Sequence, residues 1–502
     1  MLHEEARTRF ILTSLTRAIE VLFSIRQGDP LAMILYIIYI EPLLVALERK
    51  MVGLKVHTMD QKVDAYCDDV NLMTDNLDDL GKISEVVQNF EVISGAILSR
   101  DKKCKVIGFG NWSDRTEWPL PWLKPVNSLK IFGIFLSNSY REMIKINWDF
   151  RFKKFSDVMY SWSGRILDTL QQRVEIIRLF ALSRVYYVAA ALPIKSSMVK
   201  KFEALMGKFI WKFSGKILRI SIDEVKNTKL EGGLNLPCLG SMSDSLLVSQ
   251  CIRMIKSGDM RYLHRLDYWM GELLVGLVPW MGQGVGAVVT PEYFGHLGQL
   301  LTDLMIAETL SVTTLQTLTN KLVYADMTSS FPPPKVVRES NLDYQKVWSR
   351  LHTVVEPRAR DILFLLIHNK LPVPERMFSI RLRNDPYCLS CDGAEFADLE
   401  HFFCSCVKVG RIWPWLRMKV LEFSRCGQDI SNWEILNLFV SDSALDLEVT
   451  WLISSYVLYV WENIHVRNAE VKLEQFFGYL SFKYKEYQNI SKYQMKNLNG
   501  IS

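Results

Sequence analysis

Hydrophobic and polar positions change their period several times along the chain, and each change predicts a boundary between elements. Segments 10–12 and 19–23 are rich in aromatic and β-branched residues and predict two short strands joined by a polar turn. Segment 31–50 follows Pro30, a residue suited to the first turn of a helix, and is apolar on nearly all sides. It therefore predicts a buried helix.

Segment 63–73 has strand-forming residues on both sides of the adjacent acids Asp68 and Asp69. The pattern predicts a strand, a tight bend at the two aspartates and a return strand. Adjacent carboxylates repel one another, so holding them together costs free energy unless a divalent cation or a basic group offsets it. Aspartate is also common in surface turns, where it makes local hydrogen bonds. Taken alone, the pair leaves a metal site and an ordinary turn both open.

The pattern becomes mostly helical after this hairpin. Segment 78–93 predicts a helix with an acidic first turn, and segment 97–109 predicts a strand that carries basic residues. Apolar residues recur at helical spacing over 141–215. The remaining predicted features are helices at 246–255 and 297–310, a proline-rich domain boundary at 331–334 and an aromatic-rich helix pair at 451–487.

Composition supports a folded chain of several domains. The 502 residues are 49% hydrophobic and 12% aromatic, which is enough for large cores, and the length corresponds to roughly three domains. The net charge of +5 is small for this size, so a polyanionic partner would need clustered basic residues. No apolar stretch reaches the ~20 residues of a membrane-spanning helix, and residues 1–7 lack the order of a signal peptide. We expect an intracellular protein without a membrane partner.

Four residues near position 400 have the spacing of a zinc site. Cys388 and Cys391 are followed, after nine residues, by His401 and Cys406. Three thiolates and one imidazole form a closed tetrahedral set, which is typical of structural zinc. Cys404 is an alternative fourth ligand, and buried reduced thiols are the alternative without a metal. The nine cysteines of the chain, without a secretion signal, indicate a reducing compartment in which clustered thiols suggest metal.

Five motifs, in order along the chain, resemble the reverse transcriptase of LINE-like, non-LTR retrotransposons. They are Arg26-Gln27-Gly28-Asp29-Pro30-Leu31, Ile40-Glu41-Pro42-Leu43, Tyr66-Cys67-Asp68-Asp69, Ser94-Gly95 with Lys102, and Leu129-Lys130-Ile131-Phe132-Gly133. The zinc-like spacing, together with segment 370–376, resembles the zinc-binding region that ends many of these elements, and the family position favours Cys406 over Cys404. Segment 232–237 resembles a Gly-Gly-Leu-x-Leu-Pro turn of the family and is expected to be structural.

The resemblance implies a role for each motif in a polymerase palm that uses Mg²⁺ or Mn²⁺. The implied roles are metal binding for Asp68 and Asp69, support of primer and nucleotide for Tyr66, contact with template and incoming nucleotide for Arg26, Gln27 and Gly28, contact with the triphosphate for Lys102 or its neighbour Lys103, and a grip on the primer end for Phe132 and Gly133. The implied partners are an RNA template, a DNA primer and deoxynucleoside triphosphates. A nuclear location is implied as well.

The resulting fold class is α+β, with a partial palm of antiparallel hairpins and packed helices, a mostly helical thumb and a C-terminal region with a zinc knuckle. The expected division is palm 1–136, thumb-like helices 137–240, helical connector 241–335, zinc-binding region 336–420 and helical tail 421–502. For the basic residues on the thumb-like helices, a phosphate contact and an ordinary solvated position both stay open: Arg151, Lys153, Lys154, Arg165, Arg173, Arg178 and Arg184.

The expected function is RNA-directed DNA synthesis, but one of the acids that the family uses for this reaction is not found in the sequence. Nucleotidyl transfer requires two divalent cations ~4 Å apart. The family's third palm acid lies in a Phe-x-Asp strand, and the residues before Arg26 contain no such motif. We expect that the chain starts after that strand and that, as a fragment, it makes little or no DNA. The alternatives are a non-catalytic nucleic-acid-binding protein derived from a retroelement and the product of a pseudogene.

Overall fold

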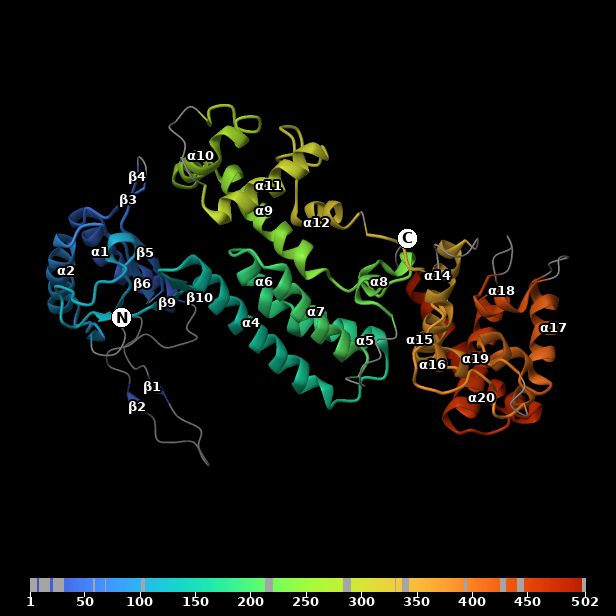
Figure 1. Ribbon diagram of the computed structural model, residues 1–502. Coiled ribbons are helices and arrows are strands. Elements are labelled where there is room, and N and C mark those ends of the chain that lie inside the picture. The colour runs from blue at the N-terminus through green and yellow to red at the C-terminus, as the bar shows by residue number, and fades with distance from the viewer. Residues whose placement is uncertain are drawn as a thin grey trace. The chain divides into compact units, whose positions relative to one another are not determined.

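The structure is a computed structural model, and it divides the chain into two compact units. The residues that it describes are 7–8, 19–20, 31–56, 59–67, 69–100, 104–212, 220–282, 290–329, 331–335, 343–391, 395–424, 430–439 and 447–498. Unit 1 comprises Met1–Asp149 and Val248–Leu318, and unit 2 comprises Phe150–Leu247 and Thr319–Ser502 (Figure 1).

All strands of the described residues lie in unit 1 and form two-stranded sheets. Four pairs are antiparallel and one, β7 with β8, is parallel. The pairs are β1 (Arg7–Thr8) with β2 (Ile19–Glu20), β3 (Leu54–Val56) with β4 (Met59–Gln61), β5 (Val63–Tyr66) with β6 (Asp69–Leu72), β7 (Lys105–Val106) with β8 (Lys124–Pro125), and β9 (Ser128–Ile131) with β10 (Ile134–Ser137). Of the strand expected over 97–109, the described residues contain only β7.

Helices α1 (Ala32–Lys50) and α2 (Asp78–Ser94) pack on each other beside the β5–β6 hairpin, in the blue part of the chain (Figure 1). Their shared core consists of Leu47, Met51, Leu80, Ile83 and Val86. The helix predicted at 31–50 is confirmed as α1, but the prediction that it is buried was wrong, because Leu47 is the single buried residue of α1. The described residues supply packing partners for the C-terminal half of α1 and leave Met33, Ile37 and Ile38 exposed.

The buried carboxylate of Asp79 fixes the start of α2 against the neighbouring chain. It accepts hydrogen bonds from the backbone N–H groups of Val52 at 3.0 Å and Gly53 at 2.9 Å. The Thr74 hydroxyl and the Lys82 ammonium also donate to it, at 2.8 and 3.0 Å. Burial opposes ionisation of this carboxyl, but the hydrogen bonds outweigh burial and lower its pKa to about 2.

The remaining helices make the protein mostly helical, and the fold class α+β is confirmed at this level. Unit 1 also contains α10 (Met260–Leu274) and α11 (Glu292–Ile306), and residues of α4 (Tyr140–Ser163) and α9 (Leu239–Ser257) belong to both units. Unit 2 contains α5 (Leu170–Ile176), α6 (Ser183–Ala189), α7 (Ser196–Ile210), α8 (Ile222–Lys226), α12 (Asn320–Thr328), α14 (Tyr344–Thr353), α15 (Pro357–Ile367), α16 (Pro374–Ser379), α17 (Ile412–Ser424), α18 (Asn432–Leu436), α19 (Leu447–Val460) and α20 (Leu473–Leu498). Palm, thumb and the five-part division stay predictions.

The core of unit 2 lies between α15 and α19, which pack directly on each other. Residues 362–367 of α15 are all buried, and so are residues 449–460 of α19 apart from Trp451, which is half-buried. A helix that is apolar on every side is stable in water only when neighbours cover it. No helix of the described residues combines the length and the apolar character that crossing a bilayer requires.

Two adjacent glycines, Gly232 and Gly233, lie where the chain passes very close to neighbouring atoms. Gly232 has a φ of +82°, and a Cβ atom on it would lie 2.7 Å from the ring of the buried Trp348. A Cβ atom on Gly233 would lie 1.9 Å from the backbone oxygen of Asn227. Only glycine fits both positions without displacement of neighbours, which agrees with the structural role expected for segment 232–237.

Candidate metal centre and acidic hairpin

The structure brings Cys388, Cys391, His401 and Cys406 together in unit 2. One donor atom from each lies within 4.8 Å of all the others. The Cys388 and Cys406 sulfurs are 3.8 Å apart, Cys391 and Cys406 3.9 Å, and the Cys391 sulfur is 3.7 Å from His401 Nε2. A tetrahedral zinc with Zn–S bonds of ~2.3 Å separates its sulfur ligands by about 3.8 Å. The donor set and its spacing thus fit four-coordinate zinc.

A tight knuckle positions the first two cysteines. The Cys388 N–H donates to the backbone oxygen of Glu395 at 2.9 Å, and the Ala397 N–H donates to that of Pro386 at 3.0 Å. The backbone N–H groups of Ser390 and Val407 lie 3.4 Å from the Cys388 and Cys391 sulfurs, respectively. Such N–H groups stabilise a thiolate more than a thiol, and they orient the sulfurs toward the cluster.

A π-helical turn, His401–Ser405, positions the other two donors. The Cys406 N–H donates to the His401 backbone oxygen at 2.8 Å, a wider turn than an α-helix makes. His401 Nδ1 lies 2.8 Å from a carboxylate oxygen of Glu395, and the backbone N–H of His401 donates to a carboxylate oxygen of Asp398 at 2.7 Å. Since Nδ1 contacts Glu395, Nε2 faces the cysteines, an orientation common for histidine ligands of metals.

Two thiols of the cluster, Cys388 and Cys406, differ in their affinity for a proton. Burial opposes ionisation of Cys388, but hydrogen bonds from His401 and from backbone N–H groups outweigh it and lower the pKa to about 7. Burial, together with the neighbouring thiols Cys388 and Cys391, raises the pKa of Cys406 to about 12. Closely spaced thiolates repel one another, so their joint ionisation requires a cation between them.

Cys404, the alternative fourth ligand, does not belong to the converging set. It is buried, and burial raises the pKa of its thiol. Next to it, Phe403 is fully buried, and its backbone oxygen accepts a hydrogen bond from the Tyr456 hydroxyl. Because these contacts turn the segment 402–404 into the core, Cys406 is the residue that reaches the cluster.

The acidic segment forms the predicted hairpin in unit 1. Val63 pairs with Leu72 at its base, where both pack against the core of α1 and α2, and Tyr66 pairs with Asp69 at its tip. The intervening Cys67 has a φ of +53°, as two-residue hairpin turns require. Tyr66 is 69% exposed and Asp69 is exposed, so the tip projects from its anchored base.

A second hairpin tip lies against the first. Phe132 and Gly133 form the turn between β9 and β10, with φ angles of +48° and +82°. The Phe132 ring lies 6.0 Å from the Tyr66 ring, edge to face at 76°. The buried Asn147 holds the second hairpin, because its side chain donates to Phe135 O at 2.6 Å and accepts from Phe135 N at 2.9 Å.

Several residues of the predicted polymerase site lie outside the described residues. They are Arg26, Gln27, Gly28, Asp68, Lys102 and the alternative Lys103. The structure describes Tyr66, Asp69, Phe132 and Gly133, and it brings Tyr66 and Phe132 together.

Arg173, one of the basic residues on the helices of unit 2, does not lie on the surface. Arg173 is buried, and its guanidinium donates to the backbone oxygens of Ile210 at 2.6 Å and Leu167 at 2.8 Å. Both alternatives open for Arg173, a phosphate contact and a solvated position, were therefore wrong. Its hydrogen bonds join α5 to the end of α7.

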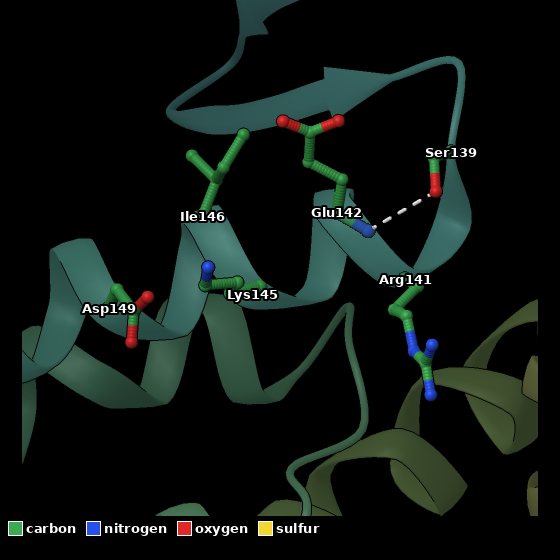
Figure 2. Close-up of a pocket in the computed structure, with 6 residues that line it drawn as sticks. All are labelled: Ser139, Arg141, Glu142, Lys145, Ile146 and Asp149. Atoms are coloured by element: carbon green, nitrogen blue, oxygen red, sulfur yellow. Dashed lines mark hydrogen bonds between the residues drawn. The ribbon is translucent and has the colours of Figure 1, made fainter.

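A pocket of about 550 Å³ opens along the first turns of α4 (Figure 2). It is lined by Ser139, Arg141, Glu142, Lys145, Ile146 and Asp149. None of these is a predicted site residue, and the two basic and two acidic side chains give the lining no dominant charge.

Sequence reasoning missed the residues that support the two sites. Glu395 and Asp398 orient His401, Tyr456 anchors the π-helical turn, and Asn147 holds the second hairpin. A signal existed for Glu395 and Asp398, because acids lie between the second cysteine and the histidine of the zinc-like spacing. No local signal marks Tyr456, since the residue it contacts lies 53 positions away.

Comparison with known proteins agrees with this geometry. A family described as zinc-binding in reverse transcriptase matches residues 328–413, which include all four converging donors. The Transposon TX1 uncharacterized 149 kDa protein of Xenopus laevis is 25% identical over 258 residues, which cover 48% of this chain. The match spans 18% of the length of that relative.

These two matches and the Cys₃His cluster identify a retrotransposon-derived protein with a reverse-transcriptase zinc-binding domain. Both matches support the resemblance to the reverse-transcriptase region of LINE-like retrotransposons that the motifs suggested. The domain match and the donor cluster also support the expected structural zinc.

Proposed function

We propose that this chain is the palm-to-zinc part of an RNA-directed DNA polymerase of a non-LTR retrotransposon. The observation that supports this proposal most directly is the contact between Tyr66 and Phe132, whose rings are 6.0 Å apart although the residues belong to separate hairpins. The motifs at these two tips resemble the metal-binding turn and the primer grip of one polymerase site, and a working site requires them to be neighbours.

In this proposal, Asp68 and Asp69 bind Mg²⁺ or Mn²⁺ at the tip of the β5–β6 hairpin. Hard divalent cations prefer carboxylate oxygens, and the described carboxylate, Asp69, is exposed and accessible. Phe132 and Gly133 would contact the primer end, and Tyr66 would support primer and nucleotide. Arg26, Gln27, Gly28 and Lys102 would face the RNA template and the deoxynucleoside triphosphate.

The proposed site offers two of the three family carboxylates. Two cations ~4 Å apart need more ligands than one aspartate pair supplies. We therefore propose that the 502-residue chain alone binds template and primer but synthesises little or no DNA. The nuclear location implied by the resemblance, and the division into palm, thumb and zinc-binding regions, belong to the same proposal.

The zinc would be held by Cys388, Cys391, His401 and Cys406. Four protein donors complete a tetrahedral site, which leaves no position for a substrate or a reactive water. Its role would be to join the knuckle to the π-helical turn, much as a disulfide would in an oxidising compartment.

A metal-binding experiment tests the proposed palm. Mn²⁺ titration of the zinc-loaded chain, followed by electron paramagnetic resonance, is expected to show binding that Asp69→Asn removes. Asp64→Asn, an exposed aspartate of the same hairpin, is the matched control and is expected to bind Mn²⁺ like the unmodified chain. Equal Mn²⁺ binding by Asp69→Asn and the unmodified chain would overturn the assignment of the hairpin.

Primer extension on an RNA template with Mg²⁺ tests the expected level of synthesis. We expect extension near background for the unmodified chain, together with binding of an RNA–DNA duplex that weakens steeply with salt. Efficient extension that Asp69→Asn abolishes would show that the chain is a complete polymerase. Duplex binding without any Mn²⁺ site would favour the non-catalytic nucleic-acid-binding protein.

A further inference from the structure

An arginine and two aromatic rings lie against one another in unit 2, where Arg165 and Phe180 are exposed and Trp162 is half-buried. The Arg165 guanidinium lies 4.2 Å above the centre of the Trp162 ring. The Phe180 ring lies 5.2 Å from the Trp162 ring, with 34° between the ring planes. Trp162 comes from the end of α4, and Phe180 comes from the π-helical turn Ile177–Ala181. We call this group the stacked triad.

The π-helical turn explains why Phe180 is exposed. The Leu182 N–H donates to the Ile177 oxygen at 2.9 Å, which closes a turn one residue longer than an α-helical one. Ile177, Ala181 and Leu182 are fully buried on the inner side, whereas Phe180 is 46% and Leu179 61% exposed. The wide turn therefore displaces two large apolar side chains outward, and such turns occur frequently at functional sites.

The segment of the chain that carries the stacked triad is rich in basic residues. Segment 150–190 contains seven basic residues and three acidic ones, Asp157, Asp168 and Glu175. Arg173 is used inside the fold, and Arg178 pairs with Glu175 at 3.5 Å. The others lie exposed or half-buried on this segment: Arg151, Lys153, Lys154, Arg165 and Arg184. Their charge complements that of a phosphodiester backbone.

We infer that the stacked triad is a platform for unpaired bases of a single-stranded nucleic acid. Bases stack on aromatic rings and on guanidinium planes, and the flanking basic side chains attract the phosphates between them. An unpaired strand fits better than a duplex, because the faces of paired bases are covered by their neighbours in the helix. The inference rests on the proposed function for the presence of nucleic acid, and it adds the strand type and the residues.

Fluorescence anisotropy with the full chain tests this platform. The probes are a labelled single-stranded RNA of about 16 nucleotides and a blunt RNA–DNA duplex of the same length. Phe180→Ala is expected to weaken single-strand binding about 5- to 100-fold, and Phe180→Trp to restore it. Arg165→Lys is expected to weaken it at least about threefold with the salt dependence unchanged, because the charge is kept and the plane is lost.

Leu179→Ala is the matched control, since Leu179 is exposed on the same turn and makes no ring stack. We expect it, and every variant on the blunt duplex, to bind within about twofold of the unmodified chain. If the unmodified chain binds the RNA and Phe180→Ala binds it equally well, the platform is overturned while the proposed function stands. Absence of all nucleic-acid binding contradicts both. Loss of self-association in sedimentation of Phe180→Ala, with unchanged RNA affinity, would make the triad a protein interface and overturn the inference.

Discussion

His401 Nδ1 lies 2.8 Å from a carboxylate oxygen of Glu395, so one residue of the knuckle orients the imidazole of the π-helical turn. This contact fixes which ring nitrogen faces the cysteines. The zinc site is thus a small network in which the knuckle and the π-helical turn each supply two of the four donors, and Glu395 of the knuckle supports His401 of the turn.

Removal of Cys406 is expected to abolish zinc binding, whereas removal of Cys404 is not. Cys406→Ser takes one donor from the converging set, and Cys404→Ala changes a buried residue outside it. Elemental analysis of protein purified without chelator should find one zinc per chain in the unmodified protein and in Cys404→Ala, and less in Cys406→Ser. Retention of full zinc by Cys406→Ser, or its loss in Cys404→Ala, contradicts the assignment.

Glu395→Gln is expected to weaken zinc affinity about 10- to 100-fold, because a neutral amide orients the imidazole and supports its basicity less well. Competition with a coloured chelator measures the change. Glu448→Gln, an exposed acid in the first turn of α19, is the control and should leave the affinity unchanged. Equal affinities for Glu395→Gln and the control would show that the contact is incidental.

Asp79→Asn is expected to destabilise the α1–α2 region by about 2 kcal/mol at neutral pH. The folded pKa of Asp79 is about 2, below its ordinary value of 3.8, so its stabilising contribution is present above pH ~4 and is lost as the pH falls toward 2. Hydrogen exchange of peptides from 45–95 at pH 7 measures the change locally.

The neighbouring Asp78→Asn is the control for this experiment, because Asp78 is exposed in the same helical turn. We expect protection in that variant to match the unmodified chain. The stability difference between the unmodified chain and Asp79→Asn should also shrink at pH 3. A difference that is independent of pH would argue against the ionised carboxylate as its source.

Asp361 is expected to make unit 2 less stable as the pH rises through 6. Burial raises its pKa to about 6, although the Leu170 N–H donates to it at 2.7 Å. A folded pKa above the ordinary value favours the protonated form, so its stabilising effect is complete below pH ~4 and lost by pH ~7. Asp361→Asn should remove this trend and raise stability at pH 7.5 by about 3 kcal/mol.

Thermal unfolding at pH 5.5 and pH 7.5 measures this trend. The exposed Asp157→Asn on α4 is the control, and it should keep the pH dependence of the unmodified chain. If Asp361→Asn keeps it as well, another group causes the dependence.

Local sequence patterns correctly predicted several helices and strands and the residues of the zinc-donor cluster. The hairpin at 63–73, the helix after Asp78 and the spacing from Cys388 to Cys406 are local features, because period, turn chemistry and ligand spacing act over a few residues. The helix at 31–50 was predicted correctly, but its burial was not, because burial depends on packing partners from elsewhere in the chain, which a local apolar pattern does not contain.

The sequence by itself determined the family resemblance, the mostly helical α+β class and the set of residues able to bind zinc. Only the tertiary structure decided that Cys406 rather than Cys404 joins the cluster and that Arg173 is buried. It also decided that Tyr66 meets Phe132 and that Phe180 projects beside Trp162. The physical reason is that these outcomes depend on contacts between distant segments, whose geometry no local pattern contains.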